Sequence, residues 1–123
     1  MSTKEQKMSS VNSLAAETYR CVVCEKDFAH DEVRRSWKCP ACDEHVYVYA
    51  EDEQTETRVV LTRKAANEVA VGDLVHLPAM LTEAPFMVLA IHQRNELLGI
   101  ALKGYGEVRF HPDQPVNCRE GSW

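Results

Sequence analysis

Four cysteines arranged as two CxxC pairs constrain this chain more than any other feature. Cys21 and Cys24 form the first pair, and Cys39 and Cys42 form the second pair after a spacer of fourteen residues. Each CxxC turn can offer two thiolates to one metal ion, and the spacer is long enough for a β-hairpin that brings the turns together. We therefore predict that the four thiolates hold one tetrahedral Zn²⁺ ion.

The expected role of this ion is structural. Four sulfur ligands complete a tetrahedral zinc site, so no position is left for water or a substrate. The ion would add folding energy to a chain of 123 residues, whose core is necessarily small. The sequence contains no phosphate-binding glycine loop, nucleophile elbow or HExxH motif. We therefore expect a protein that is not an enzyme, with no small-molecule substrate evident.

Residues 18–50 resemble a four-cysteine zinc ribbon. We call the two CxxC turns, at residues 21–24 and 39–42, the first and second knuckles. CPAC matches the second knuckle of that class, and the segments YR, VRRSWK and HVYVYA around the knuckles are predicted to be strands. The same pairs also resemble rubredoxin, an electron carrier that holds iron and has CPxC as its second knuckle. Rubredoxin knuckles are usually followed by glycine, whereas Glu25 and Asp43 occupy those places here. Iron at the four cysteines stays open as an alternative to zinc.

The second half of the chain is predicted to consist of short strands with turns between them. We expect strands at residues 58–62, 71–77, 85–93, 94–102 and 107–112. Alternation along these strands assigns one set of side chains to the core: Val75, Leu77, Met87, Leu89, Ile91, Leu98, Ile100, Leu102, Val108 and Phe110. The opposite faces, pointing outward, would carry His76, His92 and His111.

EVAVGDLVHLP and the later KGYGEVRF resemble an SH3-like small β-barrel. Together with the ribbon, this predicts a mainly β protein, with an N-terminal zinc ribbon and a C-terminal SH3-like β-barrel. The expected divisions are a flexible tail at 1–17, the ribbon at 18–50, an acidic linker or hairpin tip at 51–57 and the barrel at 58–118.

The N-terminal sequence MSTKEQKMSSVNS is polar, and no apolar run is long enough to cross a bilayer. We therefore expect a cytoplasmic protein without a membrane partner. Thiols stay reduced in that compartment, which favours a metal site over disulfides.

Basic and aromatic residues surround the second knuckle. The predicted contact residues are Arg34, Arg35, Trp37, Lys38, Tyr47 and Tyr49. Aromatic rings beside cations suit a single-stranded nucleic acid, because rings stack on bases while Arg and Lys meet phosphate. The alternative is structural, with Trp37 covering the metal site and the cations offsetting the charge of about −2 on a zinc tetrathiolate.

The sequence therefore favours a zinc-binding recognition or regulatory protein, and we expect its partner to be a single-stranded or structured nucleic acid. The net charge of −5 argues against a protein that wraps duplex DNA by bulk electrostatics. The first alternative is a protein-binding adaptor or an inhibitor of a larger complex, favoured by the acidic balance and by the segment EDEQTE. The second is a rubredoxin-like electron carrier.

Overall fold

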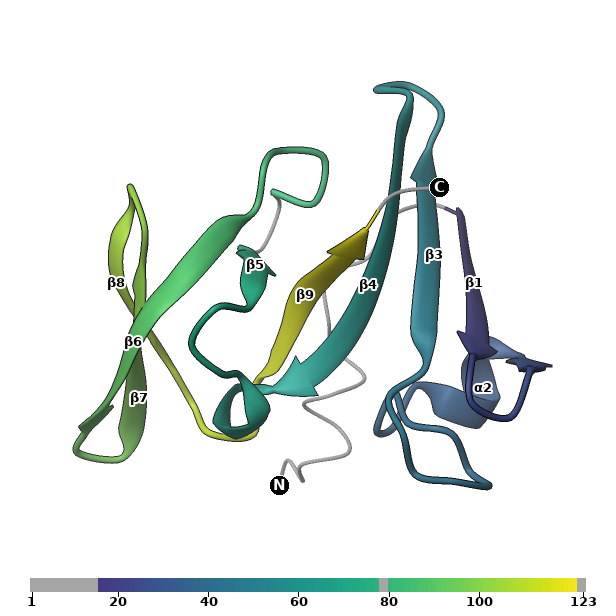
Figure 1. Ribbon diagram of the computed structural model, residues 1–123, viewed down its shortest axis with the longest axis horizontal. Coiled ribbons are helices and arrows are strands. Elements are labelled where there is room, and N and C mark those ends of the chain that lie inside the picture. The colour runs from purple at the N-terminus through teal and green to yellow at the C-terminus, as the bar shows by residue number, and fades with distance from the viewer. Residues whose placement is uncertain (1–15, 78–79, 122–123) are drawn as a thin grey trace.

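The computed structural model describes residues 16–77 and 80–121 (Figure 1). The elements along the chain are β1 (Ala16–Cys21), β2 (Lys26–Phe28), α2 (His30–Val33), β3 (Tyr47–Asp52), β4 (Thr57–Ala65), η1 (Ala66–Glu68), β5 (Leu74–His76), β6 (Phe86–Arg94), β7 (Leu97–Leu102), β8 (Gly106–Phe110) and β9 (Pro115–Gly121). The prediction of a mainly β protein is confirmed. Neither helix of the described ranges has the length and apolar character that a bilayer crossing requires.

The strands of the described ranges pair antiparallel into one open sheet, in the order β2-β1-β3-β4-β9-β5-β6-β7-β8. The last strand along the chain, β9, lies in the middle of this order. It pairs with β4 on one side, where Thr62 faces Cys118, and with β5 on the other, where Val75 faces Cys118. Figure 1 shows β1, β3 and β4 on one side of β9 and β5 to β8 on the other. The C-terminal strand therefore joins the two halves of the molecule.

The first hydrophobic core lies under β1, β3 and β4. Tyr19 pairs with Val48, and Val48 pairs with Leu61, so these three side chains share one face of the sheet. All three are buried, as are Trp37 and Cys39 from the segment between β1 and β3. The cysteine-containing segment therefore packs directly on this face of the sheet.

The second core lies inside the curved half formed by β5 to β9. Val75, Val88 and Ile100 are fully buried there, and β9 contributes Val116 and Cys118. β9 was absent from the predicted strands. Its sequence PVNCREG is mixed because its two faces meet different surroundings: Val116 and Cys118 face the second core, whereas Asn117 reaches Arg63 of β4.

One predicted core face is wrong, because β6 contains a β-bulge. Met87, Leu89 and Ile91 were expected to point inward together, but Met87 and Leu89 are exposed and Val88 is fully buried. The register with β7 shifts between Val88 and Ala90, so the inward side of the strand changes from even to odd positions. A single extra residue in one strand shifts the alternation, so every side chain beyond the bulge points to the opposite face.

The outward assignment of His76 is also wrong. The side chain is 3% exposed, and its Nδ1 lies 3.2 Å from the backbone oxygen of Met80. β9 and β6 pair with the two edges of β5, and Val75 faces the second core. His76 lies on the opposite face of the strand, where it meets Met80 of the segment after β5. His92 and His111 are exposed, as expected.

The acidic segment EDEQTE spans the end of β3 and the turn that leads into β4. The expected flexible tail lies outside the described residues, except that Ala16 and Glu17 already belong to β1, where they pair with Glu51 and Ala50. The expected division into a ribbon and a barrel stays a prediction. In the structure the two halves share β4 and β9 as paired neighbours.

Candidate metal centre

The four cysteines of the two CxxC pairs come together in space, as the sequence predicts. Their sulfur atoms all lie within 4.8 Å of one another. The Sγ atoms of Cys21 and Cys42 are 3.5 Å apart, and those of Cys39 and Cys24 are 3.9 Å apart. Each short distance thus links one knuckle with the other, so the four sulfurs form one cluster.

Two tight turns hold the sulfurs. Cys21 ends β1, and the turn that follows lets the Cys24 N–H approach the Cys21 Sγ at 3.4 Å. In the second turn the Ala41 N–H approaches the Cys39 Sγ at 3.4 Å. Backbone N–H groups aimed at sulfur stabilise the thiolate form, which is the form that binds metal.

Glu25 and Asp43, which follow the two knuckles, have φ values of 54° and 63°. Glycine adopts this left-handed conformation most readily, and rubredoxin knuckles usually have glycine at these two positions. Asp tolerates the conformation better than most residues, whereas Glu has no such advantage. Both knuckles therefore end in a left-handed residue, although neither position is occupied by glycine.

The sulfur cluster fits a tetrahedral metal ion. Zn–S bonds of about 2.3 Å in a tetrahedron place neighbouring sulfurs about 3.8 Å apart. The Cys21–Cys42 and Cys39–Cys24 Sγ–Sγ distances, 3.5 Å and 3.9 Å, lie on either side of this value. Four thiolates are also a donor set that soft or borderline metal ions select. The four residues could therefore hold one ion without a large rearrangement.

The thiols of the cluster influence one another's ionisation. Desolvation opposes ionisation of Cys39, but N–H groups of Cys42 and Ala41 outweigh it and lower the pKa of Cys39 to about 7. Hydrogen bonding to Cys42 and then desolvation raise the pKa of Cys24 to about 12. Without a cation, one thiolate thus forms easily and further ones are opposed. A divalent ion removes that opposition and releases protons as it binds.

The second knuckle is anchored to the sheet by backbone hydrogen bonds. The Cys39 N–H donates to the Glu44 oxygen at 2.7 Å, and the Asp43 N–H donates to the Cys39 oxygen at 2.9 Å. The Val46 N–H donates to the Trp37 oxygen at 3.0 Å just before β3 begins. The turn is therefore connected through Val46 to the first core.

The prediction that VRRSWK forms a strand with an exposed aromatic ring is wrong. Val33 ends the short helix α2, and a turn follows in which the Trp37 N–H donates to the Val33 oxygen at 2.6 Å. Trp37 has a φ of 57° and is 1% exposed. Its ring packs against Tyr19 and His30, with centroids 5.5 Å and 5.7 Å away. A ring that is almost completely buried cannot stack on a nucleic-acid base.

The other predicted contact residues are spread over different surroundings. Arg34 forms an ion pair with Asp31 at 3.3 Å, and Arg35 is exposed. Lys38 forms an ion pair with Glu68 at 3.1 Å, which draws it toward η1. Tyr47 and Tyr49 are half-buried on β3 and face away from the core residue Val48. The structure therefore does not gather these side chains into one platform with Trp37.

The residue that Trp37 covers is Arg63, which sequence reasoning missed. The Arg63 side chain is fully buried, and its guanidinium carbon lies 4.5 Å from the centroid of the Trp37 ring. It donates to both carboxylate oxygens of Glu17, at 2.9 Å and 2.6 Å, and its Nε donates to the Asn117 side chain at 2.8 Å. Side-chain alternation in β4 could have predicted the burial of Arg63, because Arg63 falls on the same face as Leu61.

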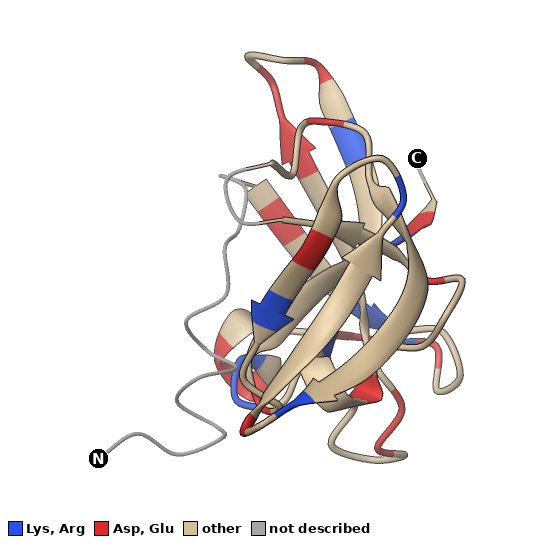
Figure 2. Cartoon of the chain, turned by 90° about the vertical axis from the view of Figure 1, so that its left-hand side faces the viewer, with Lys and Arg blue, Asp and Glu red and all other residues tan. Residues whose placement is uncertain are grey.

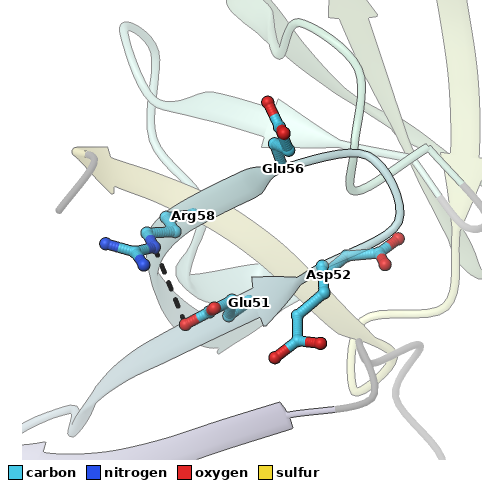
Figure 3. A pocket seen from close by; sticks show the side chains of 5 residues that line it. Glu51, Asp52, Glu56 and Arg58 are labelled. Atoms are coloured by element: carbon cyan, nitrogen blue, oxygen red, sulfur yellow. Dashed lines mark ion pairs between the residues drawn. The ribbon is translucent and has the colours of Figure 1, made fainter.

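A hollow of about 370 Å³ lies at the acidic β3–β4 hairpin and is lined by Glu51, Asp52, Glu53, Glu56 and Arg58. Arg58 forms an ion pair with Glu51 at 3.7 Å, and Glu56 and Asp52 point to different sides of the turn (Figure 3). Among the described residues, only the four cysteines gather their ligand atoms closely enough for a metal ion. The hairpin therefore forms no second metal site.

Comparison with protein-family models, with curated proteins and with solved structures finds no match to this chain.

Proposed function

We propose that this protein is a non-enzymatic recognition protein that carries a structural zinc ion and binds another protein. The observation that carries the proposal is the tetrathiolate cluster, with all four sulfurs within 4.8 Å of one another. A closed set of four sulfur ligands leaves no position for a substrate, which favours a structural role over catalysis. Cys21, Cys24, Cys39 and Cys42 would hold the ion and supply folding energy to the first half of the molecule.

Zinc is favoured over iron by the residues that follow the two knuckles. Glu25 and Asp43 stand where rubredoxin knuckles usually have glycine, so the cluster departs from the pattern of that iron protein. Zinc also has no redox change for the protein to support.

The strand order β9-β5-β6-β7-β8 supports the proposal of an SH3-like barrel in the second half. In this order a short first strand pairs with the last strand, and a meander of three strands follows. Small barrels of this kind serve as recognition surfaces in many proteins, which supports a binding function by analogy of fold.

A protein partner is favoured over a nucleic acid, which reverses the preference drawn from the sequence. Trp37 is buried, and the cations Arg34 and Lys38 are paired with acids. The chain has a net charge of −5, and basic and acidic positions are interspersed over the face seen in Figure 2. Phosphate binding requires clustered Lys and Arg, and the coloured positions in Figure 2 show no such band.

Metal analysis of the purified full-length protein tests the central claim. We expect one zinc ion per chain, a colourless solution, and unfolding of the first core when a chelator removes the ion. A red solution with one iron per chain would replace the proposal with the electron carrier. The absence of any stoichiometric metal would contradict it entirely.

Anisotropy of labelled single-stranded oligonucleotides at 50 mM salt tests the choice of partner. We expect no saturable binding. Saturable binding that Arg35→Ala abolishes would restore the nucleic-acid hypothesis instead.

A further inference from the structure

The turn of the first knuckle exposes two valines. Val22 and Val23, between Cys21 and Cys24, are 44% and 65% exposed. Turn positions favour Gly, Asn, Asp and Ser, whereas β-branched residues favour strands. Two valines here contradict the local preference and also leave apolar surface in water. Such a contradiction between local sequence and structure is expected at functional sites.

The second knuckle extends the same surface. Pro40 and Ala41, between Cys39 and Cys42, are exposed. Both turns border the same cluster, because the sulfurs of the two knuckles meet within 4.8 Å. We call the four residues Val22, Val23, Pro40 and Ala41 the knuckle tip. The cluster fixes its shape, so binding would cost little conformational entropy.

Acidic residues outnumber basic ones in the segment that carries the two knuckles. Glu25, Asp43 and Glu44 directly follow the two knuckles and are exposed. Residues 21–44 hold six Asp or Glu against four Lys or Arg, and a zinc tetrathiolate adds a charge of about −2. A phosphate backbone or an anionic membrane surface would be repelled by this rim. A second copy of the chain would present the same charge and be repelled as well.

We propose that the knuckle tip is the surface that binds the protein partner, and that the partner presents an apolar pocket rimmed by Lys and Arg. An apolar centre with a charged rim of complementary sign is the usual anatomy of a specific protein interface. This inference rests on the proposed function, because the metal site must form for the two turns to meet.

Selection from a phage-displayed library of random peptides on the zinc-loaded full-length protein tests the inference. We expect enriched peptides that combine apolar residues with Lys or Arg. Val22→Ser with Val23→Ser should weaken their binding at least about tenfold. Val71→Ser is the matched control, because Val71 is 64% exposed in the turn before β5, and it should leave binding unchanged.

A charge reversal provides the second arm. Glu44→Lys should weaken binding, whereas Glu96→Lys, in the exposed turn between β6 and β7, should not. No enrichment, enriched peptides without basic residues, or equal binding by all variants would overturn the inference. So would a dimer, seen by sedimentation, that Val22→Ser with Val23→Ser dissolves, since the occupant would then be a second copy.

Zinc content separates the two levels of failure. If every variant carries one zinc ion but peptide binding does not follow the expected pattern, only the assignment of the knuckle tip as the binding surface is wrong. If the protein carries no zinc, the proposed function fails as well.

Discussion

The guanidinium carbon of Arg63 lies 4.5 Å from the centroid of the Trp37 ring, so a buried cation is covered by the residue two positions before a cysteine of the metal cluster. Cation–π contacts of this kind gain strength when both groups are removed from water. Arg63 also reaches Glu17 on β1 and Asn117 on β9. The loop that carries the second knuckle is therefore held against three strands through one side chain.

Replacing Trp37 should destabilise the whole protein. Trp37→Ala removes a 1% exposed ring from the first core and uncovers Arg63. We expect the free energy of unfolding to fall by about 3–5 kcal/mol, measured by urea denaturation. Tyr105→Ala is the control, since Tyr105 is 55% exposed, and it should cost about 1 kcal/mol or less. Equal losses in both variants would contradict the role assigned to Trp37.

Removing the partner of the buried arginine should also be costly. The side chains of Arg63 and Glu17 are 0% and 5% exposed, and their closest atoms are 2.6 Å apart. Glu17→Ala leaves the arginine charge buried without its carboxylate, which we expect to cost about 3–5 kcal/mol. The comparison is Glu107→Ala, which breaks the more exposed pair with Arg94 and should have a much smaller effect. Similar losses would show that the Arg63–Glu17 pair is not specially stabilising.

Metal content distinguishes the cysteines of the cluster from the remaining one. Cys39→Ser should abolish stoichiometric metal binding, because three thiolates and a hydroxyl no longer complete the set. Cys118→Ala should keep one metal ion per chain, since Cys118 is buried in the second core and outside the cluster. Mass spectrometry under native conditions measures both. Retention of the full metal content by Cys39→Ser would exclude a four-sulfur site.

The stability of the protein should fall as the solution becomes acidic, partly through His76. Burial is the main cause that lowers the pKa of His76 below 6.5, while the bond to Met80 opposes the shift and nearby Arg119 adds to it. The unfolded chain therefore takes up a proton below about pH 6.5 that the folded chain refuses. The His76 contribution to stability is complete above that pH and is lost as the pH falls toward the folded-state pKa.

His76→Asn tests this contribution and can keep a hydrogen bond to the Met80 oxygen. Between pH 7 and pH 5 the parent should lose stability more steeply than the variant, by up to about 1.4 kcal/mol per pH unit. Urea denaturation at each pH gives both slopes. Parallel curves would show that His76 titrates alike in the folded and unfolded states.

Gly99 allows an ion pair to lie flat on the outer face of the sheet. A Cβ at this position would come within 2.6 Å of the Glu107 side chain, which pairs with Arg94 at 3.0 Å. Hydrogen bonding to Arg94 is the main cause that lowers the pKa of Glu107. Gly99→Ala should displace the carboxylate and raise that pKa, as measured by NMR titration. Arg94→Ala should raise it too, and an unchanged pKa in Gly99→Ala would contradict the steric explanation.

Much of this protein follows from short stretches of sequence. The mainly β character follows from alternating and β-branched segments, and the two CxxC pairs are sufficient to locate the thiol cluster. Both signals are local, because a CxxC turn supplies two ligands by itself and side-chain alternation is a property of a single strand.

Only the tertiary structure decided which faces are buried and which partners meet. The bulge at Val88 reversed the inward face of β6, and His76 is buried on β5 beside the backbone oxygen of Met80. Trp37 is buried in the first core, where its ring covers the guanidinium of Arg63 from β4, which is paired with Glu17. These outcomes depend on residues far apart along the chain, whose pairing is decided by the packing of the whole sheet rather than by the preferences of any single segment.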